Sequence, residues 1–199
     1  SMVVTHGKTL LEHQLSAIPP ECVNELILIT GFEDQKLKDF VLSLDLGFPV
    51  NFRYNNSYLT SHCAYSLLKA REEMSKGFIL INCDLLFSAS HFLSLLNSPN
   101  NNVICAKKVN DYETDLQKIN ADEDNKVMQW ELNLKEFNGE VMGPLKMSSI
   151  DVPLVLEYYD GLSEENKLQL PCFTLFSRLV NRVPFYTEFI DDDKWFEVD

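Results

Sequence analysis

The sequence of 199 residues has few glycines and few basic residues, and each shortage excludes a class of function. Seven scattered glycines cannot build a glycine-rich phosphate loop, and no Walker-type or Rossmann-type glycine motif is present. Lysine and arginine total 17 against 30 aspartates and glutamates, so the formal net charge is −13. Because a nucleic-acid binder normally carries a basic stripe, we expect neither DNA nor RNA as a partner. A small phosphate can still be held by a few placed cations or by a metal.

Long apolar runs are missing as well. No stretch approaches the roughly 18 apolar residues that a membrane span needs, and residues 1–8 do not resemble a signal peptide. The cysteines are odd in number and form no C-x-x-C pair, which argues against zinc and for a reducing compartment. They are Cys22, Cys63, Cys83, Cys105 and Cys172. We therefore expect a cytoplasmic protein without a membrane partner.

What is present is an alternation of strand-like and helix-like segments. The β-branched and leucine runs at 25–30 and 78–82 are typical of strands buried on both faces. Other strands are expected at 51–54, 102–106, 140–148, 183–190 and 195–198, with antiparallel strands within 114–134 around a turn at 122–125. Helices are expected at 10–15, 34–44, 62–76, 89–96 and 167–181, and another opens at 150–153. This order predicts one three-layer α/β/α domain with a mixed, mainly parallel sheet.

Asp84 is the first candidate for chemistry. It follows the expected strand 78–82, and open α/β sheets bind their ligands beyond the carboxyl ends of their strands. A carboxylate there suits Mg²⁺, which takes one or two protein carboxylates together with phosphate oxygens. The same position also fits a turn or a cap before the helix at 89–96. Both interpretations stay open on position alone.

A polar loop that enters a helix, at 54–67, is the second candidate. We expect Thr60 or Ser61 to cap the helix, where backbone N–H groups are able to bind an acceptor atom of a ligand. The alternative is an ordinary capped helix start. His62 by itself is expected to be structural.

The end of the chain and a set of isolated lysines supply the remaining candidates. Trp195, Glu197 and Asp199 alternate onto one face of the expected last strand, which a simple core strand does not need. An exposed face of a terminal strand is the alternative. Single lysines near strand ends are phosphate candidates in an acidic chain, although each also fits an ordinary surface position. They are Lys107, Lys108, Lys118 and Lys146.

In order along the chain, these segments resemble the nucleotidyltransferase family that includes the bacterial CTP:phosphocholine cytidylyltransferases and, more distantly, the glucose-1-phosphate thymidylyltransferases. The resemblance covers nearly the whole chain, in seven pieces of which none is diagnostic alone. The pieces are GKTLLEHQL at 7–15, ELILITGF at 25–32, Tyr54-Asn55 with Tyr58 and Tyr65-Ser66-Leu67, NCDLLF at 82–87, DLQKI at 115–119, the glycines, Glu140 and Lys146 of 139–146, and WFEVD at 195–199.

The resemblance implies a GT-A-like enzyme that transfers the nucleotidyl group of an NTP, CTP in the first instance, to a small phosphorylated acceptor such as phosphocholine or an aminoalkyl phosphonate. It implies Mg²⁺ as the cofactor, held by Asp84 and Asp199. Lys118, as a catalytic residue, and Lys146 would lie near the acceptor phosphate or the α-phosphate. Residues 1–106 would form the nucleotide-binding half and 107–199 the acceptor-binding half.

The same resemblance assigns two groups of contacts. Trp195 and Glu197 would face the acceptor, and an aromatic ring with a carboxylate is a suitable receptor for a cationic acceptor. The residues that would border the base and the ribose are Tyr54, Asn55, Thr60, Ser61 and His62.

The chain departs from the family at its ends and at the base contact. The family's first strand and glycine-rich loop would precede Ser1, and relatives continue into a helix beyond Asp199, so we expect a fragment or a binding remnant. His62-Cys63 replaces a frequent asparagine. A sugar-1-phosphate nucleotidyltransferase or a GT-A glycosyltransferase is an alternative, although Asn82-Cys83-Asp84 lacks the first aspartate of a D-x-D motif. An inactive domain that binds a nucleotide or a protein partner is another.

Overall fold

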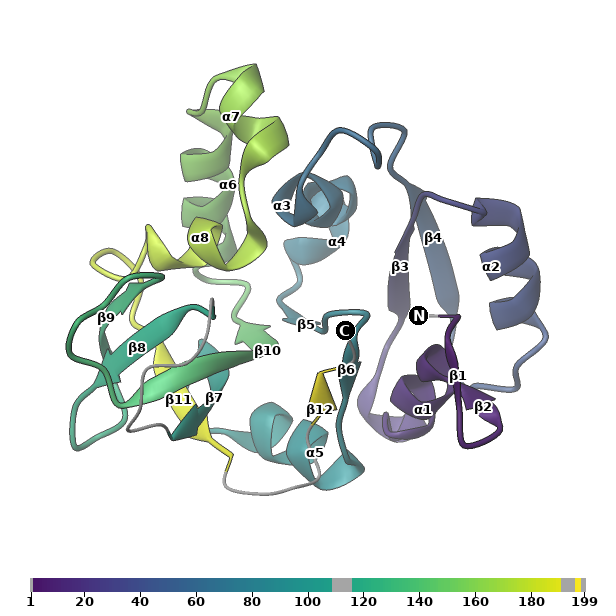
Figure 1. The fold of residues 1–199 in the computed structure, drawn as a ribbon, viewed down its shortest axis with the longest axis horizontal. Coiled ribbons are helices and arrows are strands. Elements are labelled where there is room, and N and C mark those ends of the chain that lie inside the picture. The colour runs from purple at the N-terminus through teal and green to yellow at the C-terminus, as the bar shows by residue number, and fades with distance from the viewer. Residues whose placement is uncertain (1, 109–115, 191–195, 198–199) are drawn as a thin grey trace.

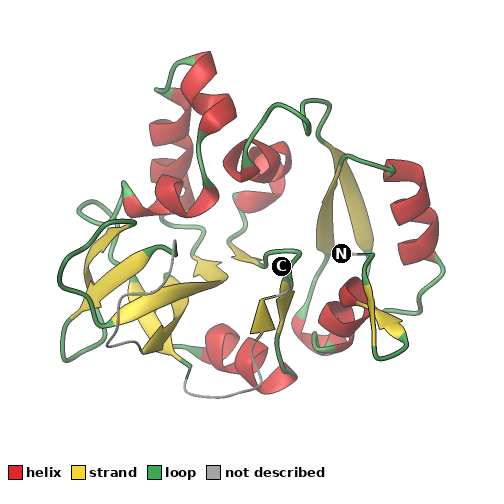
Figure 2. Cartoon of the chain, in the orientation of Figure 1, coloured by secondary structure: helices red, strands yellow, loops and turns green. Residues whose placement is uncertain are grey.

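The computed structural model describes residues 2–108, 116–190 and 196–197, and it shows a sheet with helices packed around it (Figures 1 and 2). None of the helices in these ranges is long and apolar enough to cross a membrane. The helices are α1 (Leu10–Ser16), α2 (Asp34–Leu42), α3 (Cys63–Leu67), α4 (Arg71–Met74), α5 (Ala89–Asn97), α6 (Val152–Asp160), α7 (Glu164–Gln169) and α8 (Cys172–Ser177), with 3₁₀ turns η1 (Pro20–Cys22) and η2 (Leu68–Ala70). The strands are β1 (Val4–Thr5), β2 (Lys8–Thr9), β3 (Leu26–Thr30), β4 (Val50–Tyr54), β5 (Phe78–Leu80), β6 (Leu85–Leu86), β7 (Val103–Lys108), β8 (Lys118–Ala121), β9 (Val127–Glu131), β10 (Gly139–Met147), β11 (Tyr186–Phe189) and β12 (Phe196–Glu197).

The main sheet has the strand order β11-β7-β10-β8-β9, and β5 also pairs with β10. Strand β11 runs parallel to β7, whereas β10 is antiparallel to β5, β7 and β8. Strands β3 and β4 form a parallel pair, and β6 pairs antiparallel with β12. The mixed α/β class is therefore confirmed. The expected predominance of parallel strands is not found among the described residues, where antiparallel pairs outnumber parallel ones because the long β10 runs against three neighbours.

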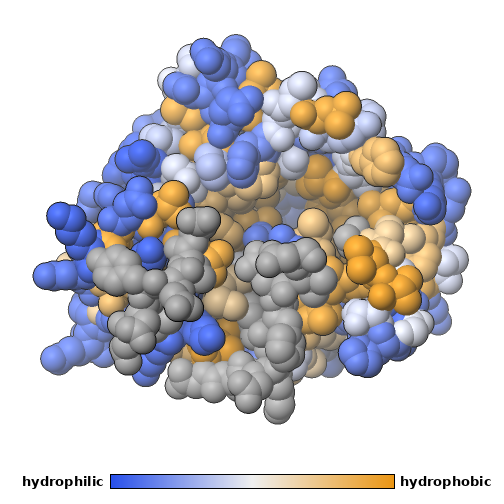
Figure 3. All heavy atoms as spheres, in the orientation of Figure 1, coloured by the Kyte–Doolittle hydropathy of each residue, from blue (hydrophilic) through white to orange (hydrophobic). Residues whose placement is uncertain are grey.

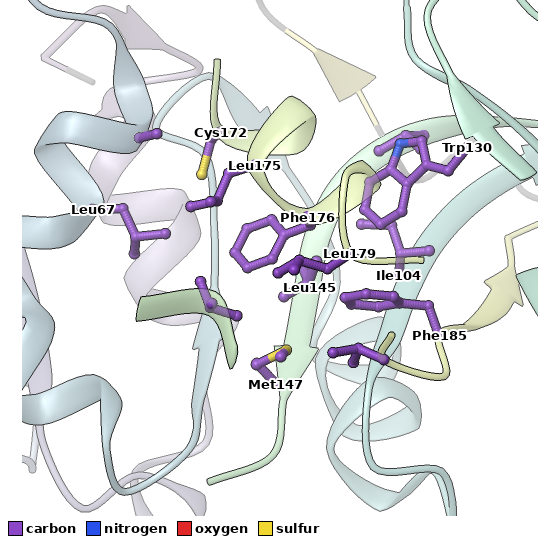
Figure 4. Packing of buried hydrophobic residues seen from close by; sticks show 14 of the residues in the cluster. Leu67, Ile104, Trp130, Leu145, Met147, Cys172, Leu175, Phe176, Leu179 and Phe185 are labelled. Carbon is purple, nitrogen blue, oxygen red and sulfur yellow. The ribbon is translucent and has the colours of Figure 1, made fainter. Parts of the chain in front are cut away.

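Strand β7 shows that the sheet is covered on both faces. Neighbouring side chains of a strand point to opposite faces. Ile104 belongs to a core formed with α6 and α8, whereas Val103 belongs to a second core formed with α1 and α5. Figure 4 shows the first core, in which the rings of Trp130 and Phe185 meet edge to face with centroids 5.5 Å apart. The predicted three layers are thus confirmed.

The two strands that were expected to be buried on both faces, β3 and β5, are only half-buried along their leucines, isoleucines and phenylalanine. In the described part of the chain each of them pairs along one edge only, β3 with β4 and β5 with β10. An edge strand has a neighbour on one side alone, so its apolar side chains keep more contact with solvent. The apolar run identified the strands correctly but not their place in the sheet.

The helix predicted at 167–181 is wrong, because the structure divides it into α7 and α8. Leu170 and Pro171 between them are extended, with ψ angles of 122° and 146°. Proline has no N–H to donate and disfavours a helical residue before it, which explains the break. The helix predicted at 62–76 is likewise interrupted, since the 3₁₀ turn η2 separates α3 from α4.

Candidate functional site

Asp84 lies in the loop that leads from β5 to β6, in a half-buried position. Its carboxylate oxygen Oδ1 is buried, and no donor among the described residues bonds to it. A buried acceptor without a partner is costly and is an exception that calls for an explanation. A cation that prefers carboxylate oxygens, such as Mg²⁺, would satisfy this atom. The arrangement therefore fits the metal-ligand interpretation of Asp84 better than the helix cap, because the cap of α5 is Ser88.

Gln14 of α1 holds this loop in place, and sequence reasoning missed it. Its side-chain Nε2 donates to the carbonyl oxygens of Asn82 and Leu85, each at 2.7 Å, and the side chain is 4% exposed. The two carbonyls flank Asp84, so one amide fixes both sides of the loop. The sequence did indicate a buried role for Gln14, because this residue lies among Leu10, Leu11 and Leu15 on the buried stripe of the helix. A polar residue on such a stripe needs buried partners.

Replacing Gln14 with alanine is expected to lower the free energy of unfolding by about 1–3 kcal/mol, because the buried carbonyl of Leu85 and the part-buried carbonyl of Asn82 lose their donor. Urea denaturation of the purified protein measures the change. Gln35→Ala is the matched control, since the exposed Gln35 makes a single bond to Asp39 on its own helix. Its effect should stay within about 0.5 kcal/mol. Equal costs for the two variants would show that Gln14 does not hold the loop.

Strand β12 brings the end of the chain to the same place. Glu197 lies opposite Leu85 in the antiparallel β6–β12 pair, so its backbone is one residue from Asp84 in register. Segments more than a hundred residues apart in sequence therefore meet here (Figure 1). Trp195 and Asp199, the other two predicted site residues of this segment, lie outside the described residues.

The loop after β4 is organised by Asn55, which is 1% exposed. Its Nδ2 donates to the hydroxyl oxygens of Ser61 and Ser66, both at 2.9 Å, and its Oδ1 accepts from the backbone N–H of Ser57. The predicted nucleotide-binding residues of this loop are thus brought together, but Asn55 and Ser61 bind each other. Tyr54, 50% exposed, and Thr60 keep surface that a ligand can reach.

The predicted N-cap at Thr60 or Ser61 is wrong, because helix α3 begins later and His62 caps it. The ring Nδ1 of His62 accepts the backbone N–H of Cys63 at 2.9 Å and lies 3.0 Å from the Cys63 sulfur. Histidine is not among the residues that usually cap helices, so composition favoured the hydroxyl residues. The expectation that His62 has a structural role is consistent with this contact.

The pKa of Cys83, which precedes Asp84, is raised by burial first and then by the negative charge of Asp84. Figure 3 shows the surface hollowed between the α3–α4 segment and the β3–β4 pair, with apolar residues along it.

Two of the four lysines predicted as phosphate candidates, Lys118 and Lys146, have different surroundings in the main sheet. Lys118 on β8 is 7% exposed, faces the 4% exposed Glu140 on β10, and its Nζ lies 5.2 Å from the ring centroid of Phe137. Lys146 instead donates from Nζ to the carbonyls of Leu96 and Ser98, at 3.0 and 2.8 Å, at the C-terminal end of α5. Lys146 therefore satisfies helix carbonyls, which sequence position did not reveal.

No protein-family model matches the sequence, and no curated protein sequence matches it significantly. Solved structures do match. An inositol-1-phosphate CTP transferase from T. maritima has a TM-score of 0.80 at 18% identity, covering 100% of this chain and 79% of that one. The CTP:phosphocholine cytidylyltransferase of Streptococcus pneumoniae has a TM-score of 0.74 at 16% identity, covering 99% and 82%. A Bacillus anthracis protein described as a glucose-1-phosphate thymidylyltransferase has a TM-score of 0.76 at 17% identity, covering 98% and 79%. The chain shares the fold of these three proteins.

Proposed function

We propose that this chain, which has the fold of the nucleotidyltransferases, transfers a nucleotidyl group from an NTP to a small phosphorylated acceptor and releases pyrophosphate. The observation that carries the proposal is the buried Oδ1 of Asp84, placed after β5 in this fold and left without a hydrogen-bond partner among the described residues. Two of the three similar structures described above are CTP-using transferases, which favours CTP as the donor and CMP as the transferred group. Phosphocholine and aminoalkyl phosphonates are the proposed acceptors.

Asp84 would hold Mg²⁺, and Asp199, which lies outside the described residues, is the proposed second ligand. When bound, the ion would offset the negative charge that develops on the transferred phosphate. The fit rests on the chemistry of the Asp84 carboxylate, whose oxygen Oδ1 is already desolvated and receives no hydrogen bond from the part of the chain that the structure describes.

The residues of the chain have mainly to position the reactants. An oxygen of the acceptor phosphate attacks the α-phosphorus in line, a new P–O bond forms, and the bond to pyrophosphate breaks. Gln14 keeps the Asp84 loop in one geometry through its two hydrogen bonds. Tyr54, Thr60 and His62 are exposed on the loop proposed for the nucleotide, which Asn55 and Ser61 hold in shape. Glu197 and Trp195 are proposed to face the acceptor, and Lys118 to lie near a phosphate.

A sugar-1-phosphate acceptor is a second candidate, because the similarity to the protein described as a glucose-1-phosphate thymidylyltransferase is as strong as that to the cytidylyltransferase. The two candidates share the reaction and differ in the acceptor. A panel of phosphocholine, 2-aminoethylphosphonate and glucose-1-phosphate, each assayed for pyrophosphate release with CTP and with dTTP, separates them.

Isothermal titration tests the proposal directly. CTP should bind in the presence of Mg²⁺ with a micromolar dissociation constant and should bind much more weakly in EDTA. ATP, GTP and UTP serve as controls for the base. If the folded protein binds none of these nucleotides with Mg²⁺, the proposed transfer reaction is wrong for this chain, and an inactive domain becomes the better description.

A further inference from the structure

The segment around Cys63 is joined to the segment before α8 by a row of hydrogen bonds. The backbone N–H of His62 donates to Leu168 O at 2.6 Å, and that of Ala64 donates to Leu170 O at 3.3 Å. Between these two donors on the first segment, the sulfur of Cys63 accepts the backbone N–H of Cys172 at 3.0 Å. Two parts of the chain separated by about a hundred residues are therefore fixed side by side, with a cysteine on each.

The two thiols differ in exposure and in their neighbours. Cys63 is exposed, whereas Cys172 is 5% exposed and lies at the edge of the first core (Figure 4). The pKa of Cys63 is lowered to about 5, first by a hydrogen bond from the thiol of Cys172, and further by the Cys172 N–H and by His62. The pKa of Cys172 is raised well above its ordinary value, by that same bond and by burial. Cys63 therefore carries the thiolate and Cys172 keeps its proton.

We propose that Cys63 and Cys172 form a peroxide-sensitive pair, in which Cys63 is oxidised first and Cys172 then closes a reversible disulfide. The pair combines an exposed cysteine, a second cysteine whose backbone N–H bonds to the sulfur of the first, and backbone bonds that hold both segments in register. This chemistry does not depend on the proposed transfer reaction. Its consequence for the fold is a covalent link between α3 and α8.

Both steps balance with hydrogen peroxide as the only co-reactant. The Cys63 thiolate attacks one peroxide oxygen, an S–O bond forms, the O–O bond breaks, and the released hydroxide takes a proton to become water. The sulfur is oxidised by two electrons to a sulfenic acid. The sulfur of Cys172 then attacks the sulfur of Cys63, an S–S bond forms and the S–O bond breaks, and the departing hydroxide leaves with the Cys172 proton as water. A dithiol reductant reverses the disulfide.

To test the proposal, the full chain is treated with hydrogen peroxide and the remaining thiols are blocked with N-ethylmaleimide. The protein is then digested without reduction, and its peptides are mapped. We expect three of the five cysteines to be alkylated and one crosslinked peptide pair that contains residues 63 and 172. Dithiothreitol should restore all five thiols. Cys63→Ser should abolish the crosslink, and Cys172→Ala should leave a sulfenic acid at Cys63 that dimedone traps.

Cys83 is the matched control, because it is also exposed and the hydrogen bonds of the described residues join its sulfur to no second cysteine. Cys63 should be oxidised roughly tenfold faster than Cys83 or more, since the thiolate is the nucleophile. Cys83→Ser should keep the crosslink. The proposal is overturned if the folded wild type keeps five alkylatable thiols, if the crosslink joins Cys83 instead, or if Cys83 reacts as fast as Cys63. The rate comparison uses the unmodified chain, so it holds even if Cys172→Ala fails to fold.

Discussion

Asp84→Asn is expected to abolish Mg²⁺-dependent pyrophosphate release while the protein stays folded. One of the few protein oxygens available to the ion is replaced by an amide, so we expect a loss of roughly 100-fold or more in kcat/KM. The stability of the protein should not fall together with its activity. In EDTA the wild type carries a buried carboxylate oxygen that has no partner within residues 2–108, 116–190 and 196–197, and removing its charge should leave the free energy of unfolding unchanged or raise it by about 1 kcal/mol.

The combination of the two results is what identifies a ligand-binding group. If the Asp84 carboxylate served only in a turn or as a helix cap, its substitution would lower the free energy of unfolding and would not change the catalytic rate. Asp45→Asn removes the same charge from an exposed position of the chain and should change neither quantity. Thermal shifts with CTP and Mg²⁺ give a readout besides activity, because ligand binding should stabilise the wild type and the Asp45 variant but not the Asp84 variant. Full activity in the Asp84 variant would remove the metal assignment.

The Asp84 loop shows how far sequence reasoning reached. A buried strand followed by an aspartate located the candidate, since the ends of strands are where α/β folds place ligands. What the sequence could not provide is the support of that loop. Gln14 reaches Asn82 and Leu85 from a helix nearly seventy residues earlier, and such a contact has no local pattern. Strand β12, which pairs with β6, is an equally distant contact.

The lysines show a different limit. Lys118 and Lys146 stand at similar places on strands, and the sequence treats them alike. The structure gives Lys146 two helix carbonyls and buries Lys118 opposite Glu140, because the neighbours of a strand depend on register and on which helix covers it. Helix breaks were more predictable than these contacts: Pro171 was visible in the sequence, and its effect on the predicted helix follows from its chemistry.

Gly143→Ala is expected to be the most destabilising substitution near the site. Gly143 has a φ of +126°, which side chains rarely adopt, and lies in the irregular stretch of β10 between Val141 and Leu145. A Cβ there would stand 2.2 Å from Cδ1 of Leu85, the buried residue next to Asp84. Backbone strain of about 1–2 kcal/mol and overpacking of about 1–3 kcal/mol should together cost about 3 kcal/mol in the free energy of unfolding.

Two other glycines separate these causes. Gly7 has a φ of +80° and open space around it, so Gly7→Ala should show the strain alone, about 1 kcal/mol. Gly161 has a φ of −72° and no contact nearer than 3.5 Å, so Gly161→Ala should be neutral or stabilising by up to about 1 kcal/mol.

Truncating Leu85 to alanine in the Gly143→Ala background should cost less than in the wild type, because the double-mutant cycle measures the clash itself. If Gly143→Ala costs no more than Gly7→Ala, the close packing of β10 against β6 does not constrain the loop that carries Asp84. If the larger cost is found, the backbone of β10 helps to set where that carboxylate stands, and the position of the site depends on a residue with no side chain of its own.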